Sequence, residues 1–204
     1  MLVIGLCGGS GSGKGEVCRL FSEIGIPFID TDALYHDMTA RKNALMDALS
    51  SRFGNDILDE NGALVRVRLA EKVFAPYAEE ELADLNRISH FYILAEVRAW
   101  LAECRKQGAS LAVVDAPLLF ESGFDKECDD IICVTAPQDI RLARIMARDN
   151  ISREYAQKRI ANQHSDAYLL ERCGYHIVNA GDISALRARV QEVVQILLRK
   201  RGNE

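Results

Sequence analysis

The chain has 204 residues, which suits one domain with appended segments and is too short for two large independent domains. Hydrophobic residues make up 49% of it and charged residues 27%, a globular composition that argues against a disordered or fibrous chain. The formal net charge of −5 gives no general basic surface for nucleic acid or an anionic membrane, so an anionic substrate must be bound by local basic residues.

Short apolar runs alternate with longer helical patterns along the chain. The first helical pattern covers residues 15–24 and the last covers residues 183–200. The apolar runs have too little polar character to leave one face in water, so they indicate a parallel sheet covered by helices on both sides. The predicted fold class is therefore α/β with a doubly wound sheet. The predicted strands are residues 2–7, 26–29, 111–114, 131–134 and 175–178.

A helical insertion is predicted between the second and third strands. It contains a helical pattern over residues 79–107 that Gly108 ends, and no convincing strand. We therefore predict a single domain over residues 1–204, with a core at about 1–32 and 109–204 and the insertion at about 33–108. Ligands of open α/β sheets bind beyond the carboxyl ends of the strands, so the insertion is well placed to bind a second substrate.

A glycine-rich loop follows the first predicted strand and precedes a helix, which is the context that a P-loop requires. Its backbone N–H groups can surround phosphate oxygens, and Lys14 adds a positive charge near the β- and γ-phosphates. This favours a P-loop NTPase-type fold that binds ATP over a turn that merely joins a strand to a helix. The predicted nucleotide contacts are Gly9, Ser10, Gly11, Ser12, Gly13, Lys14, Gly15 and Glu16.

Mg²⁺ is the predicted metal, although one of its usual protein ligands is missing. A Ser or Thr normally follows the P-loop lysine and binds the ion, whereas this chain has Gly15. Asp115 ends an apolar strand and is predicted to hold Mg²⁺, through water. Glu16 is an alternative ligand, but a solvated glutamate at the start of a helix is favoured there by the helix dipole.

Two carboxylates, Asp30 and Asp32, directly follow the second predicted strand. One of them can orient an attacking hydroxyl or accept its proton, which is the role a carboxylate plays in phosphoryl transfer. The alternative is a structural role, in which Thr31 or one of the aspartates caps the next helix.

Three arginines, Arg141, Arg144 and Arg148, are spaced to share one face of a helix. A solvated charged face is the usual meaning of such spacing. Beside a P-loop the same spacing indicates a lid, predicted at about residues 141–165, whose arginines neutralise charge on the transferring phosphoryl group.

The six cysteines are scattered and contain no Cys-x-x-Cys pair, so we expect reduced thiols and no zinc site. Cys7 and Cys133 lie in apolar runs and are interpreted as small buried hydrophobes rather than reactive thiols. The first apolar run lacks the features of a signal peptide, and no run is long enough to span a membrane. We expect a cytoplasmic protein with small-molecule substrates, no nucleic-acid or membrane partner, and a monomeric or small homo-oligomeric state.

Taken in order, several segments resemble the dephospho-coenzyme A kinase family over nearly the whole chain. The most specific is the run of residues 115–121, from Asp115 to Glu121. The others are residues 5–14, 30–32, 62–66, 73–74, 144–149 and 159–163, and Asn179 after the last strand. The resemblance implies an ATP-dependent kinase that phosphorylates the ribose 3′-hydroxyl of dephospho-coenzyme A, the last step of coenzyme A biosynthesis.

The resemblance also implies residue roles. Lys14, Asp32 and Arg144 would be catalytic, with Asp32 at the acceptor hydroxyl and Arg144 near the transferred group. Asn179 would lie near the adenine. Acceptor-binding residues would be Asp32, Arg66, His90, Arg98 and Leu118, of which Arg98 is extrapolated along the helix of His90.

Three residues depart from the family pattern. Gly15 replaces the magnesium ligand, Phe91 replaces a proline after His90 so that the helix can start or bend differently, and Leu94 stands where a basic residue is frequent. Two alternatives therefore stay open: a nucleoside or nucleotide kinase of the same fold, and a nucleotide-binding protein with lost or weakened turnover.

Overall fold

The computed structural model describes residues 1–202, with side chains as far as Lys200. The chain forms two compact units. The core unit consists of Met1–Ile29 and the chain from Leu101 onward, and the inserted unit is Asp30–Trp100. The insertion predicted at about residues 33–108 overlaps this unit, and the last helix of the insertion continues into the core unit. That this unit binds the acceptor stays a prediction.

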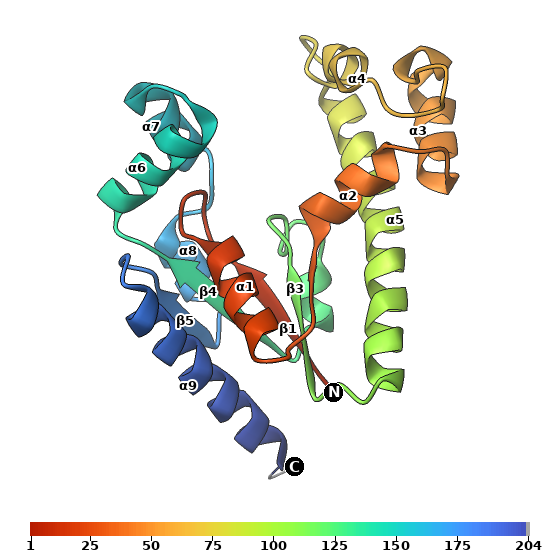
Figure 1. Ribbon diagram of the computed structural model, residues 1–204. Helices are drawn as coiled ribbons and strands as arrows, with labels where there is room; N and C mark the ends of the chain where they lie inside the picture. Colours follow the sequence, from red (N-terminus) through yellow and green to blue (C-terminus); the bar gives the residue numbers. More distant parts are fainter. Residues whose placement is uncertain (203–204) are drawn as a thin grey trace. The chain divides into compact units, whose positions relative to one another are not determined.

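A five-stranded parallel sheet forms the centre of the core unit (Figure 1). Its strand order is β2-β3-β1-β4-β5, with β1 pairing in parallel with both β3 and β4, and β4 with β5. The α/β class with a parallel sheet is therefore confirmed. The strands are β1 Leu2–Cys7, β2 Phe28–Asp30, β3 Leu111–Asp115, β4 Asp130–Thr135 and β5 Tyr175–Val178.

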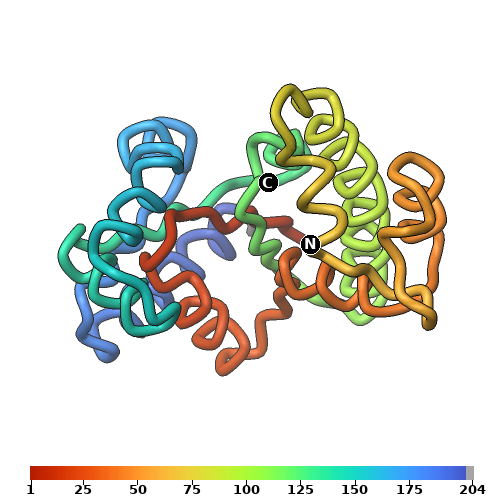
Figure 2. Tube along the Cα trace, turned by 90° about the horizontal axis from the view of Figure 1, so that it is seen from above, coloured from red at the N-terminus to blue at the C-terminus, as the bar shows by residue number. Residues whose placement is uncertain are grey.

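Helices cover both faces of this sheet. On one face α1 (Lys14–Glu23) and α9 (Ile183–Gly202) lie side by side, as Figures 1 and 2 both show, and their apolar side chains pack on alternate residues of the strands. The opposite face contacts the segment after β3, where Leu119 lies against Gly5. The other helices of the core unit are the 3₁₀ helix Phe124–Glu127, α6 Gln138–Asp149, α7 Arg153–Ala161 and α8 Asp166–Leu170.

The second strand begins at Phe28, two residues later than its apolar run predicts. Gly25 has a φ of 76° and ends α1, and the N–H groups of Gly25 and Ile26 donate to Ser22 O and Phe21 O. Ile26 is therefore used to close the helix, and Pro27 has no N–H to donate to a sheet.

The inserted unit is helical, as predicted, with its own apolar core. Buried side chains of α2, α3 and α4, among them Leu45, Leu49 and Leu69, form that core with half-buried residues of α5. The helix α5 continues through Phe91, whose N–H supports an unbroken helix where a proline would not. The elements are α2 Thr31–Thr39, α3 Ala44–Phe53, the 3₁₀ helix Asn55–Ile57, α4 Arg66–Val73 and α5 Glu79–Lys106.

Across residues 1–202, no helix combines the length and the apolar composition that crossing a bilayer requires.

Candidate active site

The loop after β1 follows a path that only glycine can take at several positions. Gly8, Gly11 and Gly13 have φ angles of 149°, 77° and 90°, in the region that side chains disfavour. A Cβ at Gly8 would lie 2.2 Å from Val134 O, and one at Gly13 would lie 2.1 Å from Asn179 Nδ2. The loop ends at the N-terminus of α1, so its backbone N–H groups and the helix dipole can both act on phosphate.

Lys14 lies between this loop and the end of β3. Its Nζ donates a hydrogen bond of 3.2 Å to Gly8 O and lies 3.9 Å from Asp115 Oδ1. The Asp115 carboxylate is only 6% exposed, and its Oδ2 accepts from the Cys18 thiol at 3.6 Å. A hard oxygen donor beside the P-loop lysine suits Mg²⁺.

The two residues after Lys14 differ in their surroundings. Gly15 is exposed, and a Cβ there would meet nothing within 4 Å. The Glu16 carboxylate accepts from Arg19 Nε at 3.2 Å and from Arg19 Nη2 at 2.5 Å, and these hydrogen bonds lower its pKa. The Glu16 carboxylate thus forms an exposed ion pair with Arg19, and the choice between a solvated glutamate and a metal ligand stays a prediction.

The three arginines of α6 do not form one equivalent row. Arg141 is 5% exposed, and its guanidinium donates to Ser10 O at 2.9 Å and to Asp166 Oδ1 at 3.0 Å. Arg148 is exposed and pairs with the neighbouring Asp149. The helical spacing alone predicts a shared face but not these different partners. Figure 2 shows the α6–α7 hairpin beside the loop after β1.

Arg144 and Asn179 meet over the phosphate loop. Arg144 Nη1 donates to Gly11 O at 3.2 Å and to Ser12 O at 3.3 Å, and Arg144 Nη2 donates to Asn179 Oδ1 at 3.0 Å. Asn179 is 4% exposed and donates from Nδ2 to Ser12 O at 3.1 Å. The structure thus brings together two predicted site residues from separate parts of the sequence.

Gln163 is a loop contact that the sequence analysis did not single out as a site residue. Its Oε1 accepts from the Ser10 N–H at 2.8 Å, and its Nε2 donates to Ser10 Oγ at 3.0 Å. The only sequence signal was its position in the predicted lid and in a segment that resembles the family. Leu118, which was predicted, lines a cavity of about 380 Å³ together with Gly8, Gly9 and Gln163.

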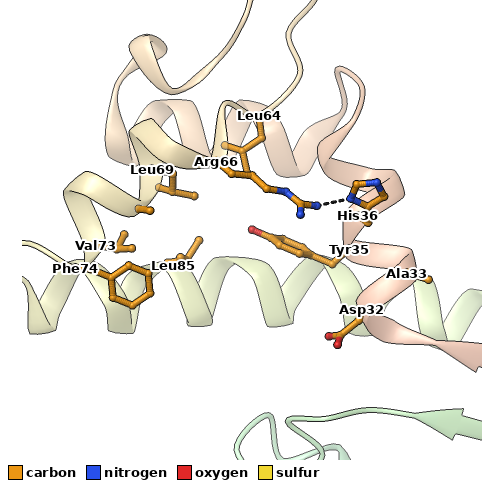
Figure 3. A pocket seen from close by; sticks show the side chains of 11 residues that line it. Asp32, Ala33, Tyr35, His36, Leu64, Arg66, Leu69, Val73, Phe74 and Leu85 are labelled. Carbon is orange, nitrogen blue, oxygen red and sulfur yellow. Dashed lines mark hydrogen bonds between the residues drawn. The ribbon is translucent and has the colours of Figure 1, made fainter. Parts of the chain in front are cut away.

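The inserted unit contains a pocket of about 600 Å³ (Figure 3). Asp32 and Arg66, both predicted acceptor residues, line it, and Arg66 Nη2 forms a hydrogen bond with His36 Nδ1. The wall opposite them is apolar. The remaining lining residues are Ala33, Tyr35, Leu64, Leu69, Ala70, Val73, Phe74 and Leu85.

Asp30 and Asp32 have different roles in α2. Asp30 Oδ1 accepts from the N–H groups of Asp32 and Ala33 at 2.9 and 3.0 Å, so Asp30 is the helix cap. Asp32 is therefore the one of the two that contributes a side chain to the pocket.

Tyr35 and His36 are pocket residues that the sequence analysis missed. They lie three and four residues after Asp32, so the helical spacing could have found them once a helix was predicted there. Burial raises the pKa of the Tyr35 phenol, which keeps it protonated. The predicted residues His90 and Arg98 lie on α5 but do not line this pocket.

A phosphate loop after the first strand of a parallel sheet, with its lysine beside a strand-end carboxylate and an arginine-bearing hairpin, defines a P-loop kinase. The sequence model of the dephospho-CoA kinase family matches residues 2–185. The chain belongs to the dephospho-CoA kinase family.

Individual relatives of the chain are named dephospho-CoA kinase. Dephospho-CoA kinase of Corynebacterium diphtheriae is 36% identical over 195 residues, which cover 96% of each chain. Dephospho-CoA kinase of Syntrophotalea carbinolica is 36% identical over 191 residues, which cover 93% of this chain and 89% of the relative. A Thermus thermophilus protein of solved structure has a TM-score of 0.79 and 31% identity over 97% of each chain.

More distant solved structures share the fold. Dephospho-CoA kinase from Campylobacter jejuni has a TM-score of 0.71 at 24% identity, covering 99% of this chain and 98% of the other. Shikimate kinase from Acinetobacter baumannii has a TM-score of 0.56 at 18% identity, covering 98% and 94%. The P-loop kinase fold is therefore common to enzymes with different acceptors.

Proposed function

We propose that the protein transfers the γ-phosphoryl group of ATP to the ribose 3′-hydroxyl of dephospho-coenzyme A, the last step of coenzyme A biosynthesis. The observation that carries this function is the family match over residues 2–185, together with relatives named dephospho-CoA kinase over almost the entire chain. The glycine path of the loop supports ATP as the donor, because it leaves backbone N–H groups free of side chains for phosphate oxygens.

The residues of the core unit neutralise the negative charge of the triphosphate. Lys14 and the loop N–H groups neutralise the β- and γ-phosphates, and the planar guanidinium of Arg144 contacts the transferred group. Asp115 would hold Mg²⁺ through water, and the ion would supply positive charge against the phosphates. Asn179 fixes Arg144 through its side-chain oxygen and lies near the adenine.

The residues of the inserted unit bind the acceptor. Asp32 orients the 3′-hydroxyl and accepts its proton as the oxygen attacks phosphorus. Arg66, whose guanidinium is hydrogen-bonded to His36, supplies the cationic side of the pocket for the diphosphate of dephospho-coenzyme A, and Leu69, Val73 and Phe74 supply its apolar side. We retain His90 and Arg98 as acceptor residues outside this pocket.

A coupled assay for ADP tests the function. Dephospho-coenzyme A, adenosine monophosphate and uridine are offered separately with ATP and Mg²⁺. ADP release with dephospho-coenzyme A alone is the expected result. Release with the monophosphate or with uridine would indicate a nucleotide or nucleoside kinase, and release with none at any Mg²⁺ level would indicate a nucleotide-binding protein without turnover.

Arg144→Lys is expected to lower kcat roughly tenfold or more although the charge is kept. The guanidinium donates to oxygens of Gly11, Ser12 and Asn179 in a fixed fork, and an ammonium cannot hold that geometry. Steady-state kinetics with ATP and dephospho-coenzyme A measure the change, and Arg148→Lys on the same helix is the control. Equal kcat values for Arg144→Lys and wild type would indicate that Arg144 only belongs to a solvated charged face of the helix.

Gly15→Ser is expected to lower the Mg²⁺ concentration that half-maximal turnover requires, and to raise kcat, because the new hydroxyl restores a ligand of the usual P-loop pattern. The site has room for it, since a Cβ at Gly15 meets nothing within 4 Å. Titration of Mg²⁺ against turnover measures the requirement. An unchanged metal dependence would mean that the loop compensates for the missing hydroxyl in another way.

Glu16→Gln is the matched variant for that titration. Arg19 holds the Glu16 carboxylate, so removing its charge should leave the Mg²⁺ requirement unchanged. A raised requirement in Glu16→Gln would instead make Glu16 the replacement ligand.

A further inference from the structure

Three cysteines that are far apart in the sequence meet on one face of the central sheet. Cys7 ends β1, and Cys133 is its register partner in the adjacent parallel strand β4. Cys173 lies in the turn between α8 and β5. The three sulfur atoms all lie within 4.8 Å of one another, and Cys7 Sγ lies 3.4 Å from Cys173 Sγ.

These separations are close to those of a metal site made of sulfur. Three thiolates around one ion with metal–sulfur bonds of about 2.3 Å have sulfurs roughly 3.8 to 4.0 Å apart. The cluster needs only small side-chain shifts to reach this spacing. It contains no oxygen ligand, so it disfavours Mg²⁺ and Ca²⁺ and suits soft ions.

We propose that Cys7, Cys133 and Cys173 bind a thiophilic d¹⁰ cation, Zn²⁺ or Cu⁺, in a three-sulfur site beneath the phosphate loop. The site is separate from the Mg²⁺ ligand Asp115 and plays no part in the phosphoryl transfer proposed above. The sequence analysis predicted no zinc site because it relied on closely spaced cysteine pairs. Here parallel pairing of two strands supplies the proximity instead.

The surroundings support a rigid site. Cys7 and Cys133 are 3% and 0% exposed and are fixed by the pairing of β1 with β4, so metal binding does not have to order the chain around these two sulfurs. His176 is the register partner of Cys133 in β5, and its Nε2 forms a hydrogen bond of 2.6 Å with Thr135 Oγ1. Cys173 is only half-buried and Cys7 lines the cavity of about 380 Å³, so an ion has a route to the sulfurs.

Hydrogen bonds within the cluster favour one thiolate, at Cys133. They lower the pKa of the Cys133 thiol well below the ordinary thiol value, and the neighbouring His176 and Arg141 act in the same direction, whereas the hydrogen bond to Cys133 and burial raise the pKa of the Cys7 and Cys173 thiols. Binding releases one proton from each sulfur that is still protonated, so the affinity for the ion should rise with pH.

The test uses the full chain, reduced and stripped with a chelator. Zn²⁺ is titrated in competition with a chromophoric zinc chelator, and Cu⁺ is titrated without oxygen against a copper(I) chelator. Wild type should bind one ion per chain. Cys7→Ala, Cys133→Ala and Cys173→Ser should each weaken binding roughly 100-fold or more, whereas Cys104→Ala and Cys128→Ala, which change cysteines outside the cluster, should bind as wild type.

A second readout, thermal stability, distinguishes the loss of a metal ligand from poor folding of a variant. The melting temperature is measured with and without the ion: the ion should raise that of wild type and of both control variants, and should leave that of Cys173→Ser unchanged. X-ray absorption should show sulfur neighbours at about 2.3 Å. Preference when both ions are offered identifies which one the site takes.

Two outcomes would overturn the proposal. One is Cys173→Ser binding either ion as tightly as wild type. The other is wild type binding neither ion while mild oxidation joins Cys7 to Cys173, shown by the loss of two thiols and by peptide mapping. The cluster would then be a redox pair rather than a metal site.

Discussion

Lys14→Ala is expected to reduce kcat by roughly 10²- to 10³-fold, the usual cost of removing a preorganised group that stabilises transition-state charge. Lys14 Nζ donates a hydrogen bond to Gly8 O and lies 3.9 Å from Asp115 Oδ1. We therefore expect its charge to interact with phosphate, and its side chain to contribute little to apolar packing. The melting temperature should therefore stay close to that of wild type. Steady-state kinetics with ATP and dephospho-coenzyme A, and a thermal melt, measure both quantities.

Lys106→Ala provides the control for this variant. Lys106 lies in the last turn of α5 with a side chain that is 76% exposed, and its loss should not change kcat. An unaltered kcat in Lys14→Ala would contradict the P-loop assignment. A large fall in melting temperature would mean that Lys14 has a structural role in the loop.

Asp32→Asn is expected to lower kcat by roughly 10² or more with little change in ATP affinity, because the amide keeps the shape of the side chain but cannot accept the proton of the hydroxyl. Asp32 belongs to the pocket of the inserted unit, whereas the loop that binds ATP belongs to the core unit. Turnover and equilibrium binding of an ATP analogue, measured on the same preparation, separate the two effects.

Asp30→Asn is a closely matched control, two residues away and with the same chemical change. Asp30 caps α2 through its side-chain oxygen, and asparagine caps helices about as well as aspartate. We expect near wild-type kcat for Asp30→Asn. If Asp30→Asn loses turnover and Asp32→Asn does not, the catalytic carboxylate is Asp30.

The fold could be predicted from the sequence because its signals are local. The strands are short apolar runs, and the path of the loop follows from glycines at Gly8, Gly11 and Gly13. The start of β2 was wrong by two residues, because the end of α1 uses the backbone of Ile26. A run of apolar residues does not reveal which of its N–H groups donate hydrogen bonds to the end of the preceding helix.

Contacts between distant residues could not be predicted in this way. Helical spacing predicts that Arg141 and Arg144 share one face of α6. In the structure Arg141 donates to Ser10 O and Asp166 Oδ1, whereas Arg144 donates to Gly11 O. The cysteine cluster depends on the register of two strands, which no motif encodes. The residue roles in catalysis stay predictions for the variants above.

The contact between Ser10 and Gln163 has a consequence for nucleotide binding. A phosphate oxygen can take the Ser10 N–H only after Gln163 Oε1 has released it. Nucleotide binding at Ser10 would therefore have to break this hydrogen bond first, and the measured affinity would be reduced by the fraction of molecules in which the hydrogen bond is formed. A side chain outside the proposed chemistry would in this way tune how tightly the nucleotide binds.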